Sequence, residues 1–275
     1  MTASLSVSIV TFAPDLALLG VALRTLAASL AHARAAGSVG ETRIAIVDNG
    51  PGDGFAAALA ELARRELAAP LEVSLLAGHG NVGYGRGHNL ALLASGADFH
   101  LVLNPDVELA PDAIDEALRY MAAHPDTVIL APEAHDASGN PLYLCKRYPT
   151  VLVLGLRGFA PGISGGFLGK KRDSYEMRDL PRDRPSFGVP LLSGSFMFCR
   201  RAPVAAIGGF DDAFFLYFED FDLSLRAVAA GRLAYVPSVR IVHHGGHAAR
   251  KGLRHVFLFA RAAATFFGRH GWRWA

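Results

Sequence analysis

Three carboxylates stand close together at Glu219, Asp220 and Asp222, directly after the apolar and aromatic string 214–218. Acidic residues are ordinary at the start of a helix, where the helix dipole favours negative charge. Three of them beside five apolar or aromatic residues are less ordinary. Because a carboxylate near an apolar wall can act as a general base toward a hydroxyl, we favour a catalytic role for this cluster.

Another carboxylate follows an apolar run at Asn104-Pro105-Asp106, where the proline stiffens the turn. Hard cations such as Mg²⁺ and Mn²⁺ take oxygen ligands and bridge phosphates, so one carboxylate suffices when a diphosphate supplies other ligands. The competing interpretation is a simple turn in which Asp106 caps the next element. Taken alone, the tripeptide favours the simple turn.

Three histidines, His243, His244 and His247, lie within five residues. Their close spacing on a Gly-Gly loop does not match the usual ligand arrangement of zinc sites. We therefore expect one imidazole to contact a phosphate or the same hard cation, and the others to lie at the surface.

A glycine-rich stretch runs from Gly78 to Asn89, and its first part matches the G-x-G-x-x-G pattern of dinucleotide-binding turns. That pattern belongs after the first strand of the unit, but here the first strand ends in 11–14 (TFAP), without glycine. The glycines continue through Gly87, which predicts a longer loop whose backbone approaches a ligand closely. A plain glycine-rich turn is the structural alternative.

These groups must be positioned by a framework that alternates strands and helices in the first half. Strands are predicted over 5–12, 43–47, 71–76 and 100–103, and helices over 15–36, 54–67 and 111–123. Such alternation predicts parallel strands joined by crossover helices. Ligands of such sheets gather beyond the carboxyl ends of the strands, where Asp48, the glycine-rich stretch and Asp106 fall.

The second half is less regular. Residues 146–188 are rich in Arg, Gly, Pro and Asp and are predicted as a long loop or lid, which in compact domains is functional or disordered. Strands are predicted over 191–200 and 233–236, a helix over 218–230, and a basic, aromatic helix over 249–267.

Bulk composition limits the protein class. Of 275 residues 51% are hydrophobic, enough for a buried core, yet no apolar run reaches the roughly 18 residues of a membrane span. The N-terminus has no signal-peptide pattern. Two cysteines, Cys145 and Cys199, cannot make a disulfide framework and fit a reducing cytosol.

Charge is distributed unevenly along the chain. The net charge is +2, but no acidic residue follows Asp222, whereas nine Arg and Lys residues do. The first 222 residues therefore carry 18 basic and 25 acidic side chains, a net of 18 − 25 = −7. This split predicts that the C-terminal tail meets an anionic surface or ligand, either nucleic acid or phospholipid by charge alone.

Eight strings in a fixed order resemble the family 2 glycosyltransferases with a GT-A fold, especially the bacterial rhamnosyltransferase-like branch. They are 7–12 (VSIVTF), 47–50 (VDNG), 80–89 (GNVGYGRGHN), 103–107 (LNPDV), 193–197 (SGSFM), 208–211 (GGFD), 218–223 (FEDFDL) and 243–246 (HHGG). One such string is weak support, but eight spanning about residues 5–250 are strong.

The resemblance implies an α/β fold of the GT-A type, with a Rossmann-like nucleotide-binding half, a mixed central sheet flanked by helices, and a C-terminal helical extension. The implied domains are a GT-A domain over 1–248, divided into a nucleotide-sugar-binding half (1–106) and an acceptor-binding half (107–248), and a basic aromatic helix over 249–275. The implied activity is inverting transfer of a sugar, rhamnose from thymidine-diphosphate rhamnose in particular, to a glycan hydroxyl in cell-surface polysaccharide or lipopolysaccharide synthesis.

The resemblance also implies residue roles. Asp220 would be the catalytic base, and Asp106 and His243 would hold Mg²⁺ or Mn²⁺, with Asn104 in place of the first Asp of the family's D-x-D motif. The implied donor-binding residues are Thr11, Phe12, Asp48, Asn81, Gly83, Tyr84, Gly85, Arg86, Asn89 and Asn104. The implied acceptor-binding residues are Ser193, Gly194, Ser195 and Glu219.

The expected partners are a nucleotide-sugar donor and a glycan or lipid-linked acceptor, with no nucleic acid. We expect a cytoplasmic protein whose residues 249–275 contact the cytoplasmic face of the inner membrane, because tryptophan and phenylalanine beside basic residues suit an interfacial helix. The alternative for this segment is a C-terminal helix that packs its aromatic side chains on the core and leaves its arginines in water. A nucleotidyltransferase and an NAD-dependent oxidoreductase using the glycine-rich stretch remain the alternatives. A non-catalytic carbohydrate-binding module is disfavoured by the Asp220 cluster.

Overall fold

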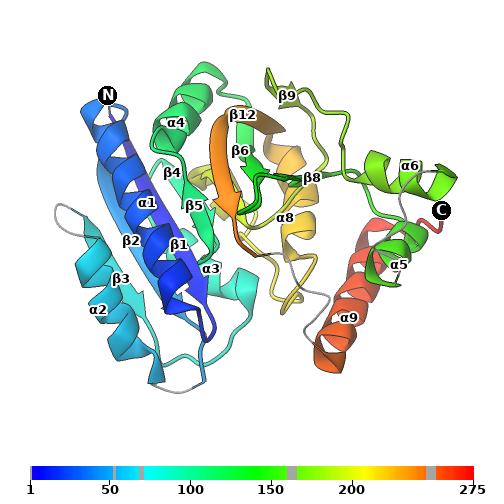
Figure 1. Cartoon of the computed structure of the whole chain (residues 1–275), viewed down its shortest axis with the longest axis horizontal. Coiled ribbons are helices and arrows are strands. Elements are labelled where there is room, and N and C mark those ends of the chain that lie inside the picture. Colours follow the sequence, from blue (N-terminus) through cyan, green and yellow to red (C-terminus); the bar gives the residue numbers. More distant parts are fainter. Residues whose placement is uncertain (1, 52–53, 68–70, 160–165, 246–251) are drawn as a thin grey trace.

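A mixed sheet forms the centre of the molecule (Figure 1). The computed structural model describes residues 2–51, 54–67, 71–159, 166–245 and 252–275. The main path of the ten-stranded sheet runs in the order β3 (Glu72–Leu76), β2 (Val39–Asp48), β1 (Ala3–Thr11), β4 (Phe99–Leu103), β11 (Phe196–Arg200), β6 (Thr127–His135), β12 (Arg232–His243) and β5 (Val107–Leu109). β7 (Pro141–Leu142) pairs with β6, and β9 (Ser186–Phe187) with β12.

The strand directions decide which residues meet at one edge. β1, β2, β3 and β4 are parallel, and β11 is antiparallel to both β4 and β6. β6 and β12 are parallel to each other, so β12 runs in the same direction as β4. The carboxyl ends of β1, β2, β4 and β12 therefore lie along the same edge of the sheet as the start of β11.

Helices cover both faces of the sheet. α1 (Leu16–Ala35), α2 (Ala56–Glu66) and α4 (Ala113–Ala123) bury their apolar residues in one core with the strands. α3 (Tyr84–Leu92), α7 (Arg201–Ala206) and α8 (Glu219–Ala227, continued by a 3-10 turn at Val228–Ala230) pack in a second core. The sheet thus carries helices on two sides, as in other doubly covered α/β sheets.

α1 shows how local sequence makes these elements. Its N-cap Asp15 accepts hydrogen bonds from the N–H groups of Ala17 and Leu18 at 2.9 and 3.2 Å, which satisfies two otherwise unpaired donors. By length and composition α1 could cross a membrane, contrary to the expectation that no segment could. It packs instead on α2, α4 and β5 and belongs to the core, which accounts for its apolar character.

Three helices gather at one end of the molecule with the C-terminus (Figure 1, right). They are α5 (Val151–Phe159), α6 (Gly166–Tyr175) and α9 (Leu253–His270). A third, aromatic cluster joins α9 to α8 and the segment before it through Phe214, Phe218, Phe266 and Phe267. The backbone N–H groups of Val151 and Leu152, at the start of α5, donate to the carbonyls of Arg273 and Trp274 at 2.9 and 3.1 Å, so the last residues of the chain cap α5.

Most predicted elements of the first half are confirmed within one to four residues, but several expectations were wrong. Part of the glycine-rich stretch is helical from Tyr84, because Gly85 and Gly87 let α3 pack closely on its neighbours. Residues 146–188 are no single loop, since α5 and α6 lie within them. β6 was not predicted at all, because its run of buried residues lacks alternation.

The remaining differences concern strand and helix limits. The strand predicted over 233–236 runs from Arg232 to His243, with a register shift between Val236 and Arg240 that hides the alternation. The strand predicted over 191–200 is two strands, β10 (Leu191–Leu192), which pairs with β8 (Cys145–Lys146), and β11. The helix expected over 249–275 is Leu253–His270; residues 271–275 are not helical, and 249–251 lie outside the described residues.

Candidate functional site

The polar side chains singled out from the sequence meet at the carboxyl edge of the sheet. Asp48 is the last residue of β2, Asn104 directly follows β4, and His243 is the last residue of β12. Asp106 lies between β4 and β5, and Asn104 donates its backbone N–H to the carbonyl of Ser195 at 2.9 Å. The fold therefore brings together residues from both halves of the chain.

Asp106 and His243 form the centre of the candidate cation site. The Nε2 atom of His243 lies 3.3 Å from Oδ1 of Asp106 and 3.5 Å from Nδ2 of Asn104. Burial raises the pKa of Asp106, but the contact with His243 outweighs it and leaves the pKa below its ordinary value. Asp106 is therefore ionised at neutral pH.

The donor set fits a cation whose remaining ligands come from a substrate. Oδ1 of Asp106 is buried and, apart from its 3.3 Å contact with Nε2 of His243, has no hydrogen-bond partner among the described residues. No group of three or more His, Cys, Asp or Glu ligands exists within the described ranges. A carboxylate and an imidazole suit Mg²⁺ or Mn²⁺ when phosphate oxygens complete the shell. His244 is turned away from this pair, since its Nε2 contacts Glu108.

Tyr84 connects the two sides of the site. Its hydroxyl lies 2.6 Å from the carbonyl of Gly194 and 2.8 Å from Oδ1 of Asn104, so one proton is shared between two acceptors. Burial first, then the charges of Glu219 and Asp220, raise the pKa of Tyr84 well above its ordinary value. Tyr84 therefore stays protonated and holds the Gly194 loop against Asn104.

Asp220 is a half-buried carboxylate held by backbone hydrogen bonds. Oδ2 accepts from the N–H of Gly194 at 2.8 Å, and Oδ1 accepts from the N–H of Phe221 at 2.9 Å. Burial raises the pKa of Asp220 to about 6, although both backbone donors and the charge of Lys146 oppose the rise. A carboxylate with such a pKa is ionised at neutral pH and basic enough to accept a hydroxyl proton.

Glu219 sits next to Asp220 in a different environment. Its side chain is buried, and Oε2 has no hydrogen-bond partner among the described residues. Burial first and the charge of Asp220 second raise the pKa of Glu219 well above its ordinary value. Because like charges at one site do not both ionise easily, the pair keeps a proton on Glu219 and the charge on Asp220.

Asp222 is excluded as the base by its contacts. Its Oδ2 accepts from Nε of Arg226 at 2.7 Å, and its Oδ1 lies 2.8 Å from Nε2 of His270. The side chain is 1% exposed. Both oxygens are thus engaged away from the sheet edge, and of the three clustered carboxylates Asp220 is best placed to receive a proton.

An unusual backbone conformation precedes this carboxylate pair. Tyr217 and Phe218, neither of them glycine, have φ angles of +73° and +65°. Each such residue costs about 1–3 kcal/mol and persists only where its surroundings hold it. The turn directs the first residues of α8 inward, so that Glu219 and Asp220 face Tyr84 and Gly194.

Lys146 lies close enough to Asp220 to affect its charge, although no motif in the sequence marks it. This lysine of β8 is 7% exposed, and its positive charge lowers the pKa of Asp220. It lies in the stretch predicted as a loop, and a single lysine there carries no pattern that would distinguish it. Its influence follows from the pairing of β8 with β10, which precedes Gly194.

The glycine-rich stretch is built for close packing. At Gly83, φ is +94° and a Cβ would lie 2.5 Å from the carbonyl oxygen of Phe215. At Gly85 a Cβ would lie 2.7 Å from Cβ of Phe210. The Asn81 side chain accepts from the N–H of Gly83 at 3.0 Å. These residues fix the start of α3, and their contact with a donor stays a prediction.

Asn89 and Arg86 lie further along α3. The Asn89 amide donates to the carbonyl of Phe210 at 2.7 Å and accepts from the N–H of Phe210 at 2.9 Å, so both ends of the amide are engaged inside the protein. Arg86 is half exposed and lies 3.4 Å from Asp212. Of the two, the half-exposed Arg86 is the more accessible to a ligand, although it pairs with Asp212, and both donor roles stay predictions.

The ends of β1 and β2 carry the other predicted donor contacts. Asp48 is buried and accepts from the N–H of Gly50 at 2.9 Å. The Thr11 hydroxyl donates to the carbonyl of Val47 at 3.3 Å, whereas the Phe12 side chain is 55% exposed. An exposed ring just after β1 and a buried carboxylate at the end of the neighbouring β2 suit a planar base with N–H donors, and these roles also stay predictions.

Three of the four predicted acceptor residues, Ser193, Gly194 and Ser195, form the loop before β11, and the fourth, Glu219, is the first residue of α8. Gly194 donates to Asp220 and accepts from Tyr84, and the Ser193 and Ser195 hydroxyls lie 3.5 Å apart. A Cβ at Gly194 would lie 3.2 Å from the Tyr84 ring and 3.3 Å from Cβ of Asp220. The loop thus sits directly against Asp220, and its contact with an acceptor stays a prediction.

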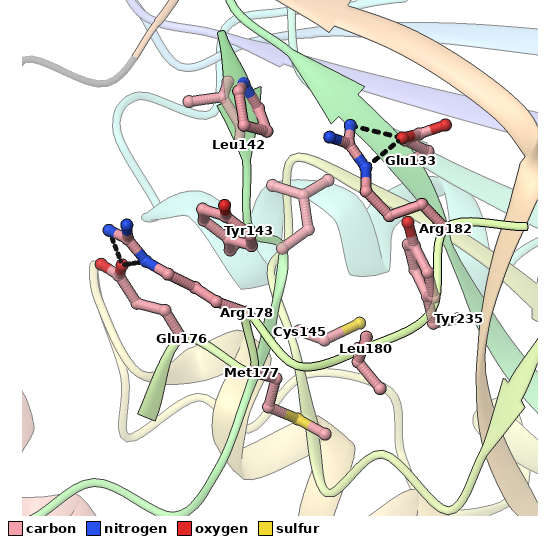
Figure 2. A pocket seen from close by; sticks show the side chains of 12 residues that line it. Glu133, Leu142, Tyr143, Cys145, Glu176, Met177, Arg178, Leu180, Arg182 and Tyr235 are labelled. Atoms are coloured by element: carbon pink, nitrogen blue, oxygen red, sulfur yellow. Dashed lines mark hydrogen bonds and ion pairs between the residues drawn. The ribbon is translucent and has the colours of Figure 1, made fainter. Parts of the chain in front are cut away.

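A separate pocket is lined by residues of β6, β8 and β12 and of the segment after α6 (Figure 2). Its wall is mainly apolar and aromatic, and two arginines reach its rim. Nε of Arg182 donates to Glu133 at 2.6 Å, and Nη2 of Arg178 donates to Glu176 at 2.6 Å. Because these charges neutralise each other, the pocket offers no chemistry comparable to the sheet edge. The residues that line the pocket are Glu133, Pro141, Leu142, Tyr143, Leu144, Cys145, Glu176, Met177, Arg178, Leu180, Arg182 and Tyr235.

Comparison with known proteins points in the same direction as this geometry. Residues 20–208 match the family described as "Glycosyl transferase family 2". An N-acetylglucosaminyl-diphospho-decaprenol L-rhamnosyltransferase of Mycobacterium tuberculosis is 32% identical over 218 residues, which cover 73% of this chain and 69% of the relative. The rhamnosyltransferase WbbL of Escherichia coli K12 is 27% identical over 61% of this chain and 63% of its own.

Solved structures share the fold at low sequence identity. GalNAc-T7, solved with UDP, GalNAc and Mn²⁺, superposes with a TM-score of 0.62 at 14% identity and covers 89% of this chain. Staphylococcus aureus TarS superposes with a TM-score of 0.56 at 15% identity and covers 98%. The chain spans 43% of each of these longer chains. The likeness confirms the expected α/β GT-A fold with its mixed central sheet.

Proposed function

The chain belongs to glycosyl transferase family 2, and from this premise we propose that it transfers rhamnose from thymidine-diphosphate rhamnose to a glycan hydroxyl with inversion. It is a glycosyltransferase whose relatives include rhamnosyltransferases. The observation that carries the mechanism is Asp220, a carboxylate with a pKa of about 6 held beside the Gly194 loop. The match favours neither a nucleotidyltransferase nor an NAD-dependent oxidoreductase.

The reaction needs two groups on opposite sides of the sugar. One stabilises the negative charge of the leaving diphosphate, and the other removes the proton of the acceptor hydroxyl. As the nucleoside diphosphate leaves, negative charge develops on it, and Mg²⁺ or Mn²⁺ bound there would stabilise that charge. Asp106 and His243 are the residues that would hold the cation. Asp220 accepts the acceptor proton during attack, and no covalent intermediate is required because one base suffices for a single displacement.

The donor half binds the nucleotide sugar in this proposal. Thr11, Phe12 and Asp48 contact the nucleoside, whereas Arg86 reaches toward the diphosphate or the sugar. The remaining donor residues are Asn81, Gly83, Tyr84, Gly85, Asn89 and Asn104, and the acceptor residues are Ser193, Gly194, Ser195 and Glu219. The proposal is supported by the position of Thr11, Asp48 and Asn104 at the carboxyl ends of β1, β2 and β4, where α/β sheets bind ligands.

A donor screen tests the proposed function. Purified protein is incubated with Mg²⁺ or Mn²⁺ and a panel of nucleotide sugars, and release of nucleoside diphosphate is measured, with thymidine-diphosphate rhamnose expected to react fastest. Calorimetry with thymidine and uridine diphosphates compares the bases directly. Uridine diphosphate binding tighter by more than tenfold, about 1.4 kcal/mol, would count against rhamnose as the donor sugar.

The cation has its own test. Excess chelator should abolish transfer, and Mg²⁺ or Mn²⁺ should restore it. Asp106→Ala should weaken binding of nucleoside diphosphate in the presence of Mn²⁺ but change metal-free binding little, because the carboxylate acts through the cation. Full transfer activity in excess chelator would contradict metal dependence while leaving the base assignment intact.

The acceptor is proposed to be a lipid-linked glycan in cell-surface polysaccharide or lipopolysaccharide synthesis. One rhamnosyltransferase relative carries N-acetylglucosaminyl-diphospho-decaprenol in its name. On this chain, Phe257, Trp272 and Trp274 are half or more exposed, beside the basic residues of α9. We infer a cytoplasmic enzyme that contacts the inner membrane through this helix, with no nucleic-acid partner.

A further inference from the structure

The segment that leads into α8 has a backbone conformation that requires support from its surroundings. We define the catalytic turn as residues 211–222, which contain the two left-handed residues Tyr217 and Phe218 and the proposed base Asp220. Left-handed non-glycine residues persist only where surrounding contacts determine them. The structure around the turn must therefore supply those contacts.

α9 contacts both left-handed residues. The Tyr217 hydroxyl lies 2.9 Å from Nδ1 of His255, and its ring centre lies 5.5 Å from that of Phe259. The Phe218 ring packs between two α9 rings, 5.1 Å from Phe259 and 5.2 Å from Phe266. Phe266 is fully buried and Phe218 nearly so.

The last turn of α9 makes polar contacts with both ends of the catalytic turn. Arg269 donates from Nη1 to Oδ2 of Asp211 at 2.6 Å. His270 lies with Nε2 2.8 Å from Oδ1 of Asp222, whose side chain is 1% exposed. Consecutive residues of one helix end thus bind the first and the last residue of the turn.

We propose that α9 is a brace that holds the catalytic turn and thereby keeps Asp220 against the Gly194 loop, with Phe259 and His270 as positioning residues. The brace acts through packing and polar contacts on one face of α9, whereas the opposite face carries the exposed residues Arg254, Phe257 and Arg261. The expected effect of the brace on turnover rests on the proposed function, but its expected effect on the position of Asp220 does not.

Hydrogen exchange tests the brace without reference to activity. Phe259→Ala and His270→Ala should speed exchange of the Gly194 and Phe221 amides by at least about tenfold, because both amides donate to Asp220, while the β1–β2 amides keep their rates. His270→Gln should restore slow exchange, because its amide can still donate to Asp222. Ala264→Ser, at an exposed α9 position, is the matched control.

Measuring sugar-transfer kinetics of the same variants is the second test of the brace. Phe259→Ala and His270→Ala should lower kcat about tenfold or more with unchanged affinity for nucleoside diphosphate, since the donor half is untouched. Unchanged exchange at Gly194 and Phe221 in both variants would overturn the brace. Faster exchange in a protein that transfers no sugar would support the brace and contradict the proposed function.

Discussion

The two neighbouring carboxyl groups at the start of α8, those of Glu219 and Asp220, differ in protonation state. Asp220 receives two backbone N–H donors and the nearby charge of Lys146, whereas Glu219 is buried with one oxygen unpartnered within the described part of the chain. The pair therefore carries its proton on Glu219. Sequence motifs alone could locate the pair but could not separate its members, because burial and backbone donors come from tertiary structure.

Substitution distinguishes the two carboxyls. Asp220→Asn should preserve the fold and donor binding but lower turnover by about 10²- to 10⁴-fold, the range of general-base catalysis. Glu219→Gln should cost far less, within about tenfold, because glutamine resembles the neutral acid. Steady-state kinetics of both variants decide the matter. A larger loss in Glu219→Gln than in Asp220→Asn would reverse the assignment.

The pH dependence of turnover follows from the same residue. Burial raises the pKa of Asp220 to about 6, and a base must be ionised to accept a proton. Turnover should therefore be constant above neutrality and fall about tenfold per pH unit below pH 6. The check is kcat measured from about pH 5 to 8 at saturating substrate. A profile that stays flat down to about pH 5 would remove Asp220 from the base role.

At the scale of elements, the early strands and helices were predictable and the later ones were not. β1, α1 and β2 have clear periodicity or capping, so sequence alone located them closely. β12 conceals its alternation behind a register shift, and α6 is polar enough to resemble a loop. The meeting of Asp48 and Asp106 at one edge of the sheet was predictable because each ends or follows a strand. The contact between Tyr217 and His255 was not, since the two residues are far apart in sequence.

The backbone at the start of α3 requires glycine at position 83, and this requirement can be tested. Gly83→Ala should destabilise the protein by about 1–3 kcal/mol, because φ is +94° and the new Cβ would meet the carbonyl oxygen of Phe215. Gly96→Ala is the control, since nothing lies within 4 Å of the added Cβ. Denaturant unfolding of both variants measures the difference. Equal midpoints would show that α3 adjusts freely.

At the scale of the whole molecule, charge and apolar surface gather at the end that carries α9. Arg254, Phe257 and Arg261, spaced three and four residues apart, share an exposed face of the helix. Val256 and Phe257 are 57% and 67% exposed. A basic, aromatic face of this kind suits an anionic membrane surface, while the opposite face of α9 packs on the catalytic turn.

Vesicle binding tests this surface. The protein should sediment with vesicles containing phosphatidylglycerol and less with neutral ones, and binding should weaken as salt increases. Reversing both charges with Arg254→Glu and Arg261→Glu should weaken binding at least about tenfold, since each basic residue contributes about 1 kcal/mol. Glu41→Gln, on the distant β2, is the control. Equal binding of all three proteins would assign the face to another role.

The configuration of the transferred sugar tests the central claim most directly. Nuclear magnetic resonance of the glycoside formed from thymidine-diphosphate rhamnose reports whether the anomeric centre has inverted. A single displacement assisted by Asp220 predicts a product of opposite configuration to the donor, because the acceptor attacks the face away from the diphosphate. Retained configuration would contradict the account, since it requires either a covalent intermediate or attack on the face from which the diphosphate leaves, and a single displacement assisted by Asp220 provides neither.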